Sequence, residues 1–134
     1  MDLAETETRD KFEAERLPQL MDLYAGEWWS ARRTLADVAH MLQSTDLLVA
    51  SVHRPTDRLV GFARVITDFT YLAVILDVIV APNWRGSGLG SLLVDTVIGH
   101  ERLAKVQSLE LVCQPTSSPS MVTAASPTSS VAPG

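Results

Sequence analysis

The stretch 78-VIVAPNWRGSGLGSLL-93 joins an apolar run to a leucine-rich run through three glycines, Gly86, Gly88 and Gly90, that alternate over five residues. Arg85 stands directly before the first glycine. Because glycine has no Cβ atom, such a backbone can curl until consecutive N–H groups point at one ligand. A helix that starts here adds the favourable potential of its dipole for negative charge. The stretch therefore predicts a strand-to-helix turn that an anion approaches closely.

Three phosphate ligands are familiar at such a junction, and the spacing of the glycines separates them. A mononucleotide P-loop needs a lysine followed by serine or threonine after the last glycine, whereas Ser91 and Leu92 follow here. A dinucleotide turn needs G-x-G-x-x-G directly after a strand, whereas this chain has G-x-G-x-G after the intervening residues 82–85. The interpretation that fits is a pyrophosphate held by main-chain N–H groups. A turn used only for close helix–strand packing explains one glycine well and three poorly.

The hydrophobic pattern around this turn predicts alternating helices and strands. Helical spacing of apolar residues predicts a helix over residues 18–29 and a second one that begins at Thr34, where Thr34 and Asp37 have the spacing of a capping box. A further helix follows the glycines. Strands are predicted at residues 47–53, 59–67, 71–80 and 108–113. The sequence thus predicts an α/β (α+β) domain, in which an antiparallel meander is joined to one crossover.

The two ends of the chain differ from this middle part. Residues 1–16 show no clear pattern, so they are predicted as a poorly defined segment of a domain that spans residues 1–113. Residues 114–134 contain nine serines or threonines, four prolines and no charged or aromatic residue. Such a composition predicts a disordered tail.

Composition limits the partners of the chain. Its 134 residues suffice for one domain, and its formal charge of −5 without a basic stripe argues against nucleic acid as a partner. The apolar runs are too short or too interrupted to span a membrane, and no signal peptide is visible, so a cytoplasmic protein is expected. His40, His53 and His100 lack metal-ligand spacing, so no metal is expected. The single cysteine, Cys113, is expected to be a buried apolar side chain rather than a nucleophile.

From Val80 to Leu93 the chain has the pattern V-x-P-x-x-R-G-x-G-x-G-x-L-L, which resembles motif A of the GNAT superfamily of N-acetyltransferases. The pattern of that motif, R/Q-x-x-G-x-G/A, is met by Arg85, Gly88 and Gly90. The predicted order of elements is also similar to that of the family. The resemblance implies a GNAT-like fold, a mixed and mainly antiparallel sheet flanked by helices.

Two further segments resemble a small bacterial subgroup of this family. They are 27-EWWSARRTLADV-38 and 59-LVGFARVITD-68. The resemblance as a whole covers roughly residues 17–115. It implies an enzyme that transfers an acetyl group from acetyl-coenzyme A to a primary amine of a small molecule or peptide.

The resemblance also implies where the coenzyme binds. The backbone of Val78, Ile79 and Val80 is expected to hydrogen-bond the pantetheine arm as it would an added strand. The pyrophosphate is expected to lie against the main-chain N–H groups of the turn. The residues of this turn are Arg85, Gly86, Ser87, Gly88, Leu89, Gly90 and Ser91.

The sequence leaves the catalytic and acceptor groups open. Asp77 is the one charged residue in the run 71–80, and it can accept the proton of the attacking amine, cap a neighbouring backbone group or pair with Arg64. The family often forms its acceptor pocket at the end of the first helix. This chain has Glu27, Trp28 and Trp29 there, which suit tryptophans of the core beside a solvated glutamate at least as well.

The chain departs from the family after its last predicted strand. A GNAT protein normally continues with a helix and two strands, and the subgroup has a tyrosine that protonates the leaving thiolate. Residues 114–134 contain no tyrosine, and their sequence does not predict a helix or strands. Three hypotheses follow: an N-acetyltransferase, a truncated coenzyme-binding or interaction module without turnover, and the product of a shifted reading frame. An uncovered sheet edge also favours a homodimer, which is common in the family.

Overall fold

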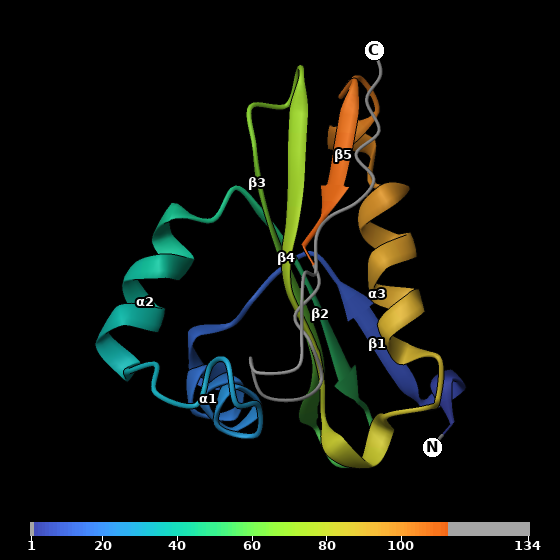
Figure 1. The fold of residues 1–134 in the computed structure, drawn as a ribbon. Coiled ribbons are helices and arrows are strands. Elements are labelled where there is room, and N and C mark those ends of the chain that lie inside the picture. Colours follow the sequence, from blue (N-terminus) through green and yellow to red (C-terminus); the bar gives the residue numbers. More distant parts are fainter. Residues whose placement is uncertain (1, 113–134) are drawn as a thin grey trace.

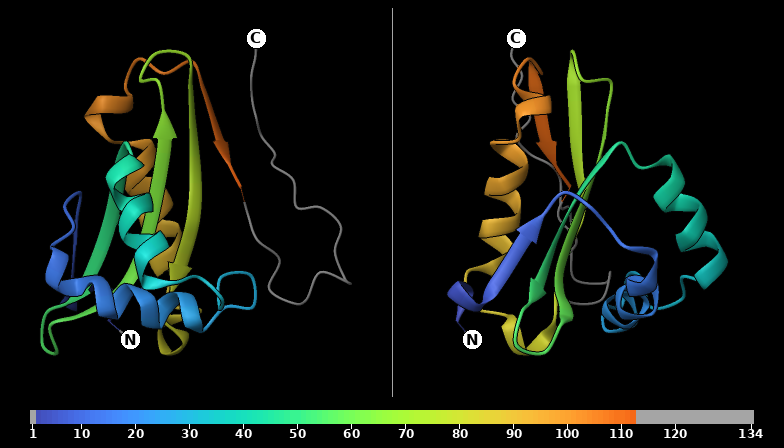
Figure 2. Two further views of the ribbon diagram at one scale, coloured as in Figure 1. Left: turned by 90° about the vertical axis from the view of Figure 1, so that its left-hand side faces the viewer. Right: turned by 180° about the vertical axis from the view of Figure 1, so that it is seen from behind.

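The computed structural model describes residues 2–112 and shows one five-stranded sheet with helices on both faces. Helices α1 and α2 cover one face, and α3 covers the other (Figures 1 and 2). The strands, in their order across the sheet, are β1 (Thr6–Arg9), β2 (Leu47–His53), β3 (Arg58–Thr67), β4 (Leu72–Val80) and β5 (Ser108–Leu111). The α-helices are α1 (Leu17–Ala25), α2 (Leu35–Ser44) and α3 (Leu89–Ile98). Short 3-10 helices are η1 (Leu3–Glu5), η2 (Ala14–Arg16), η3 (Pro82–Trp84) and η4 (Glu101–Leu103).

The predicted mixed, mainly antiparallel sheet is confirmed. Neighbouring strands are antiparallel except β4 and β5, which run parallel because α3 forms the crossover between them. The predicted cap of the second helix is also present, since the Asp37 N–H donates to the Thr34 hydroxyl at 3.2 Å. The first helix ends at Ala25 rather than at residue 29, because Gly26 caps it and the chain then turns. The predictions for Cys113 and for residues 114–134 lie outside the described residues.

Strand β4 changes its surroundings halfway along its length. Its first half, from Leu72 to Ile75, pairs with β3 on one edge and with β5 on the other. The Val112 N–H still donates to the Ile75 carbonyl at 3.0 Å, and there the described pairing ends. Within residues 2–112, the second half of β4, residues 76–80, therefore has no strand on its β5 edge.

A β-bulge lies where this second half begins. Asp77 and Val78 together stand opposite one residue of β3, Ala63. Asp77 has φ of +54°, a left-handed conformation that is uncommon for residues other than glycine but is adopted by Asp more often than by most. The extra residue reverses the alternation of the strand. Ile75 consequently packs in the α3 cluster, whereas Ile79 packs in the α1 cluster.

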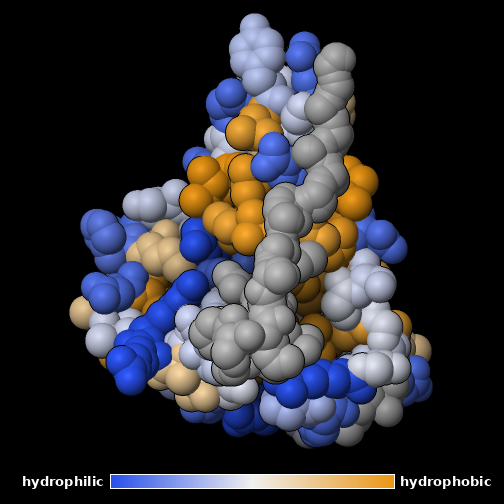
Figure 3. Space-filling model, viewed as in Figure 1, coloured by the Kyte–Doolittle hydropathy of each residue, from blue (hydrophilic) through white to orange (hydrophobic). Residues whose placement is uncertain are grey.

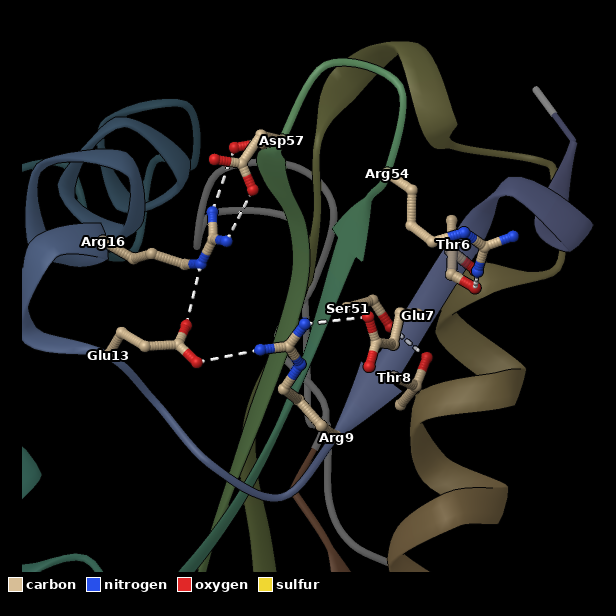
Figure 4. Close-up of polar contacts among 9 residues, drawn as sticks. All are labelled: Thr6, Glu7, Thr8, Arg9, Glu13, Arg16, Ser51, Arg54 and Asp57. Atoms are coloured by element: carbon tan, nitrogen blue, oxygen red, sulfur yellow. Dashed lines mark hydrogen bonds and ion pairs between the residues drawn. The ribbon is translucent and has the colours of Figure 1, made fainter.

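The N-terminal segment forms an edge strand that the sequence analysis missed. Strand β1 pairs antiparallel with β2, from Thr6 opposite His53 to Arg9 opposite Ala50. Its sequence, TETR, contains no apolar residue, so it lacks the alternation of apolar and polar residues that marks a half-buried strand. Hydrogen bonds hold β1 on β2 in place of apolar contacts. Besides the strand pairing, the hydroxyl groups of Thr8 and the buried Ser51 are bonded to each other (Figure 4).

A chain of ion pairs fastens this segment to the β2–β3 hairpin (Figure 4). Arg9 pairs with Glu13 at 2.8 Å, Glu13 pairs with Arg16 at 2.9 Å, and Arg16 pairs with Asp57 at 2.8 Å. Because the Asp57 side chain is 82% exposed, its pair contributes little free energy but sets the path of the chain between β1 and α1.

No helix within residues 2–112 combines the length and the apolar character that crossing a membrane requires.

A first prediction concerns Gly61 of β3, which lies beneath α3. A Cβ atom on Gly61 would stand 3.1 Å from Leu93 Cδ1 and 3.2 Å from Leu89 Cδ2, and both leucines are buried. Gly61→Val should therefore lower the free energy of unfolding by about 1 to 2 kcal/mol, since overpacking outweighs the strand preference of valine. Urea denaturation measures the change, with Gly61→Ala as the milder comparison. A valine variant as stable as the wild type would contradict this packing of α3.

Candidate functional site

The glycine turn lies where β4 ends and α3 begins, as the sequence predicts (Figure 1). Gly86 and Gly88 have φ of +79° and +93°, a conformation that side chains rarely allow. Gly88 is the N-cap of α3 and has no side chain to bond the free N–H groups of the first turn. Among residues 2–112, the N–H groups of Gly86, Gly88, Gly90 and Ser91 have no hydrogen-bond acceptor.

Gly90 differs from the other two glycines of the turn. It lies in the first turn of α3 with an ordinary backbone conformation, and a Cβ atom there would have the Val80 side chain, at 3.8 Å, as its nearest neighbour. The fold therefore tolerates a side chain at position 90. A glycine there instead keeps the surface beside Val80 open.

A cavity of about 390 Å³ lies between β4, α3 and the end of β5. Its position follows from β4, because the cavity opens where β5 stops pairing with that strand. A ligand here would meet the open edge of β4 along one side and the free N–H groups of α3 at its end. The lining residues are Val78, Gly90, Ser91, Val94, Asp95, Leu111 and Val112.

The residues predicted to hold the pantetheine arm point to different sides of β4. Val78 lines the cavity, and Val80 packs against the clusters under α3. Ile79 is buried on the opposite face, against α1. Their side chains do not converge on one point, so a shared function of these three residues has to rest on their main-chain groups.

Asp77 holds a polar cluster on the α1 face of β4. It is 5% exposed and accepts from Arg33 and Arg64, each at 2.7 Å, and from the Tyr24 hydroxyl at 3.0 Å. Burial by itself would raise the pKa of Asp77, but the hydrogen bonds and charges of the two arginines bring the pKa below its ordinary value. The pairing with Arg64 that the sequence left open is therefore present. A carboxylate held in this way is a weak proton acceptor.

Tyr24 and Arg33 complete the cluster. Burial, with the charge of Asp77 in addition, raises the pKa of Tyr24, so its hydroxyl stays protonated and donates. Arg33 also lies over the Tyr24 ring, with its guanidinium carbon 4.6 Å from the ring centroid. Neither residue was singled out from the sequence. No local pattern marks them, because Asp77 stands 53 residues after Tyr24 and 44 after Arg33.

The residues predicted to form the acceptor pocket are spread over the loop after α1. Glu27 forms an ion pair with Arg85 of the glycine turn, which joins the α1–α2 loop to that turn. Trp29 packs edge-on against Tyr24, with ring centroids 6.3 Å apart. Trp28 is 41% exposed.

Within residues 2–112, no three His, Cys, Asp or Glu side chains are grouped so as to hold a metal ion.

Comparisons with known proteins agree with this geometry. The acetyltransferase (GNAT) family model matches residues 5–121. The GCN5-related N-acetyltransferase 1, chloroplastic, of Arabidopsis thaliana is 31% identical over 99 residues, which are 74% of this chain and 50% of that protein. The uncharacterized N-acetyltransferase ycf52 of Pyropia yezoensis is 29% identical over 86 residues, 63% of this chain and 49% of that protein.

Solved structures share the fold. A crystal structure of a GNAT-family protein from Xanthomonas campestris has a TM-score of 0.67 and 26% identity, and the match covers 81% of this chain and 75% of that chain. An acetyltransferase structure from Trypanosoma brucei has a TM-score of 0.65 and 25% identity, covering 81% and 83% of the two chains. The chain spans about half the length of the curated relatives it matches.

The Asp77 cluster generates a prediction about stability. Asp77→Asn leaves two half-buried guanidinium groups without their counter-charge, so it should lower the free energy of unfolding by about 2 to 4 kcal/mol. Urea denaturation at neutral pH measures this change. Asp22→Asn is the control, because the Asp22 side chain is 72% exposed and its partner Arg58 is 3.6 Å away.

The lowered pKa of Asp77 also predicts that the stability difference between the wild type and Asp77→Asn depends on pH. Because folding lowers the pKa of Asp77 below 3.8, its contribution is complete above that pH and is lost as the pH falls through the lowered pKa. Between about pH 5 and pH 3, the wild type should therefore lose more stability than Asp77→Asn. Equal losses in the two proteins would contradict the ion pairs.

Proposed function

This chain belongs to the acetyltransferase (GNAT) family, and from that premise we propose that it binds acetyl-coenzyme A in the cavity between β4, α3 and β5. The acceptor in this proposal is a primary amine of a small molecule or peptide. One observation carries the proposal: within residues 2–112, an edge of β4 without a strand partner and N–H groups of the glycine turn without acceptors border the same cavity.

Each part of the coenzyme has a matching surface in this proposal. The main-chain groups of Val78 to Val80 would bind the pantetheine arm along the open edge, as a strand binds a neighbour. The N–H groups of the turn would bind the pyrophosphate, helped by the dipole of the ten-residue helix α3. The missing Cβ atom of Gly90 lets the phosphates lie against Val80.

The chemistry of the proposal is direct transfer. The amine nitrogen attacks the thioester carbon, so a C–N bond forms and the C–S bond breaks, while the amine gives up a proton and the thiolate gains one. A bulge leaves strand pairing locally incomplete, and a main-chain N–H at the Asp77–Val78 bulge is suited to the thioester oxygen. For Asp77 itself we favour a positioning role over that of the base, because two arginines already occupy its carboxylate.

Other predictions of the sequence stay predictions. These are the bacterial subgroup, the cytoplasm, the homodimer, the absence of nucleic acid or membrane as partner, and the domain boundary at residue 113. Glu27, Trp28 and Trp29 stay proposed acceptor residues. The Glu27 carboxylate can contact an acceptor only when its ion pair with Arg85 opens.

The coenzyme site predicts that Gly90→Val reduces the affinity for coenzyme A at least tenfold. A Cβ atom at position 90 has room in the protein, with Val80 Cγ2 at 3.8 Å as its nearest neighbour, whereas the valine side chain would enter the space proposed for the phosphates. Calorimetric titration with coenzyme A measures the affinity, and the melting temperature checks the fold. Gly99→Val, at the far end of the same helix, is the matched control. Gly88 is a less clean site for the test, because a side chain at φ +93° strains the backbone.

Turnover is tested with acetyl-coenzyme A and a panel of primary amines. We expect thiol release that depends on the amine. If acetyl-coenzyme A binds but no amine causes thiol release, the alternative of a coenzyme-binding module without turnover is favoured. Folded protein that neither binds the coenzyme nor catalyses thiol release would contradict the proposed function.

A further inference from the structure

Arg64 of β3, next to Asp77 on the α1 face of the sheet, carries N–H groups that no part of the described protein uses. Its side chain is 15% exposed, and its Nε donates to Asp77 at 2.7 Å. The two terminal nitrogens, Nη1 and Nη2, have no hydrogen-bond partner among residues 2–112, and neither is sealed from solvent. The Nη1 and Nη2 groups of this largely buried guanidinium can therefore donate to a ligand on the α1 face of the sheet.

The charges around Asp77 do not cancel. One carboxylate faces two guanidinium groups, and Tyr24 stays neutral, so the cluster has a surplus of one positive charge. The ion pair between Glu27 and Arg85 is balanced within itself, so it does not offset this surplus. A positive charge held in a half-buried place attracts an anion more strongly than one on the open surface does.

The surroundings of the cluster suit a small amphipathic ligand. Ile66, two residues along β3 from Arg64, is 45% exposed, and Figure 3 shows apolar residues gathered over β4 and β5. Hydrophilic residues border this apolar area on the side of α2 (Figure 3). A ligand whose charged group reaches Arg64 can therefore cover apolar surface with its remaining atoms.

The cluster also lies next to the proposed reaction site. Asp77 immediately precedes Val78, which lines the cavity on the opposite face of β4. A coenzyme in that cavity occupies the α3 face, which leaves the α1 face for the second substrate. Among residues 2–112, no strand lies beside β4 after Ile75, and the two substrates can meet through this opening in the sheet.

We propose that Arg64, supported by Arg33 and Asp77, binds a negatively charged group of the acceptor, so that the amine this protein acetylates also carries a carboxylate or a phosphate. The planar fork formed by Nη1 and Nη2 matches two oxygens of either group. Asp77 acts here as a positioning residue, because it fixes both guanidinium groups. The inference rests on the proposed function and narrows its acceptor.

Matched acceptor pairs test the inference. The amines are phosphoethanolamine against ethanolamine, and serine against serinamide, which separate phosphate from carboxylate. In the wild type, one anionic member should have a kcat/KM at least ten times that of its neutral partner. In Arg64→Gln this ratio should fall at least tenfold. Glutamine keeps a donor for Asp77 and leaves the Arg33 pair in place, so the fold should survive.

Two further variants separate a binding role from a structural one. Arg32→Gln removes the same charge from an exposed residue that directly precedes Arg33, and it should leave the ratio unchanged. Arg64→Lys keeps the charge but loses the fork, so it should restore part of the preference. If Arg64→Gln does not fold, Arg33→Gln takes its place. It leaves the Arg64 fork but removes the surplus positive charge, so the ratio should still fall, by a smaller factor.

A measurement without turnover covers the case of a binding module. With coenzyme A at saturation to fill the pyrophosphate site, phosphoethanolamine or serine should raise the melting temperature more than its neutral partner does, and Arg64→Gln should abolish the difference. Equal use and equal stabilisation by anionic and neutral amines, or a preference that persists in Arg64→Gln, would overturn the inference. Failure of coenzyme A to bind would instead overturn the proposed function beneath it.

Discussion

The edge of β4 that no strand of residues 2–112 pairs with, along residues 76–80, is the constraint on which the rest of the described structure depends. A strand edge without a neighbour exposes main-chain donors and acceptors, and such an edge persists when something else covers or uses it. Here the free edge begins beside a bulge, runs along the cavity and ends at the glycine turn. The three features follow one another along a single stretch of chain, from Asp77 to Ser91, so one ligand can use all of them.

The bulge at Asp77 gives β4 two functional faces. Because of the extra residue, Val78 turns into the cavity on the α3 side, while the neighbouring Asp77 turns to α1 and there holds Arg33 and Arg64. A buried carboxylate between two arginines is costly to desolvate and contributes no obvious advantage in stability over an apolar core. Its position, one residue from the cavity, is better explained by the need to fix two cations beside the proposed acceptor.

The sequence predicted those parts that local patterns determine. The glycine turn, the cap at Thr34 and the strand at residues 47–53 depend on neighbouring residues, and each was found where it was predicted. The parts that were missed depend on distant contacts: strand β1 has no apolar residue, and the ion pair of Glu27 with Arg85 joins residues 58 positions apart. The bulge belongs to the same class, since its register is set by pairing with β3.

The most direct measurement of the central claim is the change in backbone amide chemical shifts of the isotope-labelled protein as coenzyme A is added. The largest changes should fall on the second half of β4, residues 76–80, and on the turn and first helical residues, 85–91. Changes confined to other parts of the protein, such as β1 or α2, or no change at all in folded protein, would contradict the proposed site.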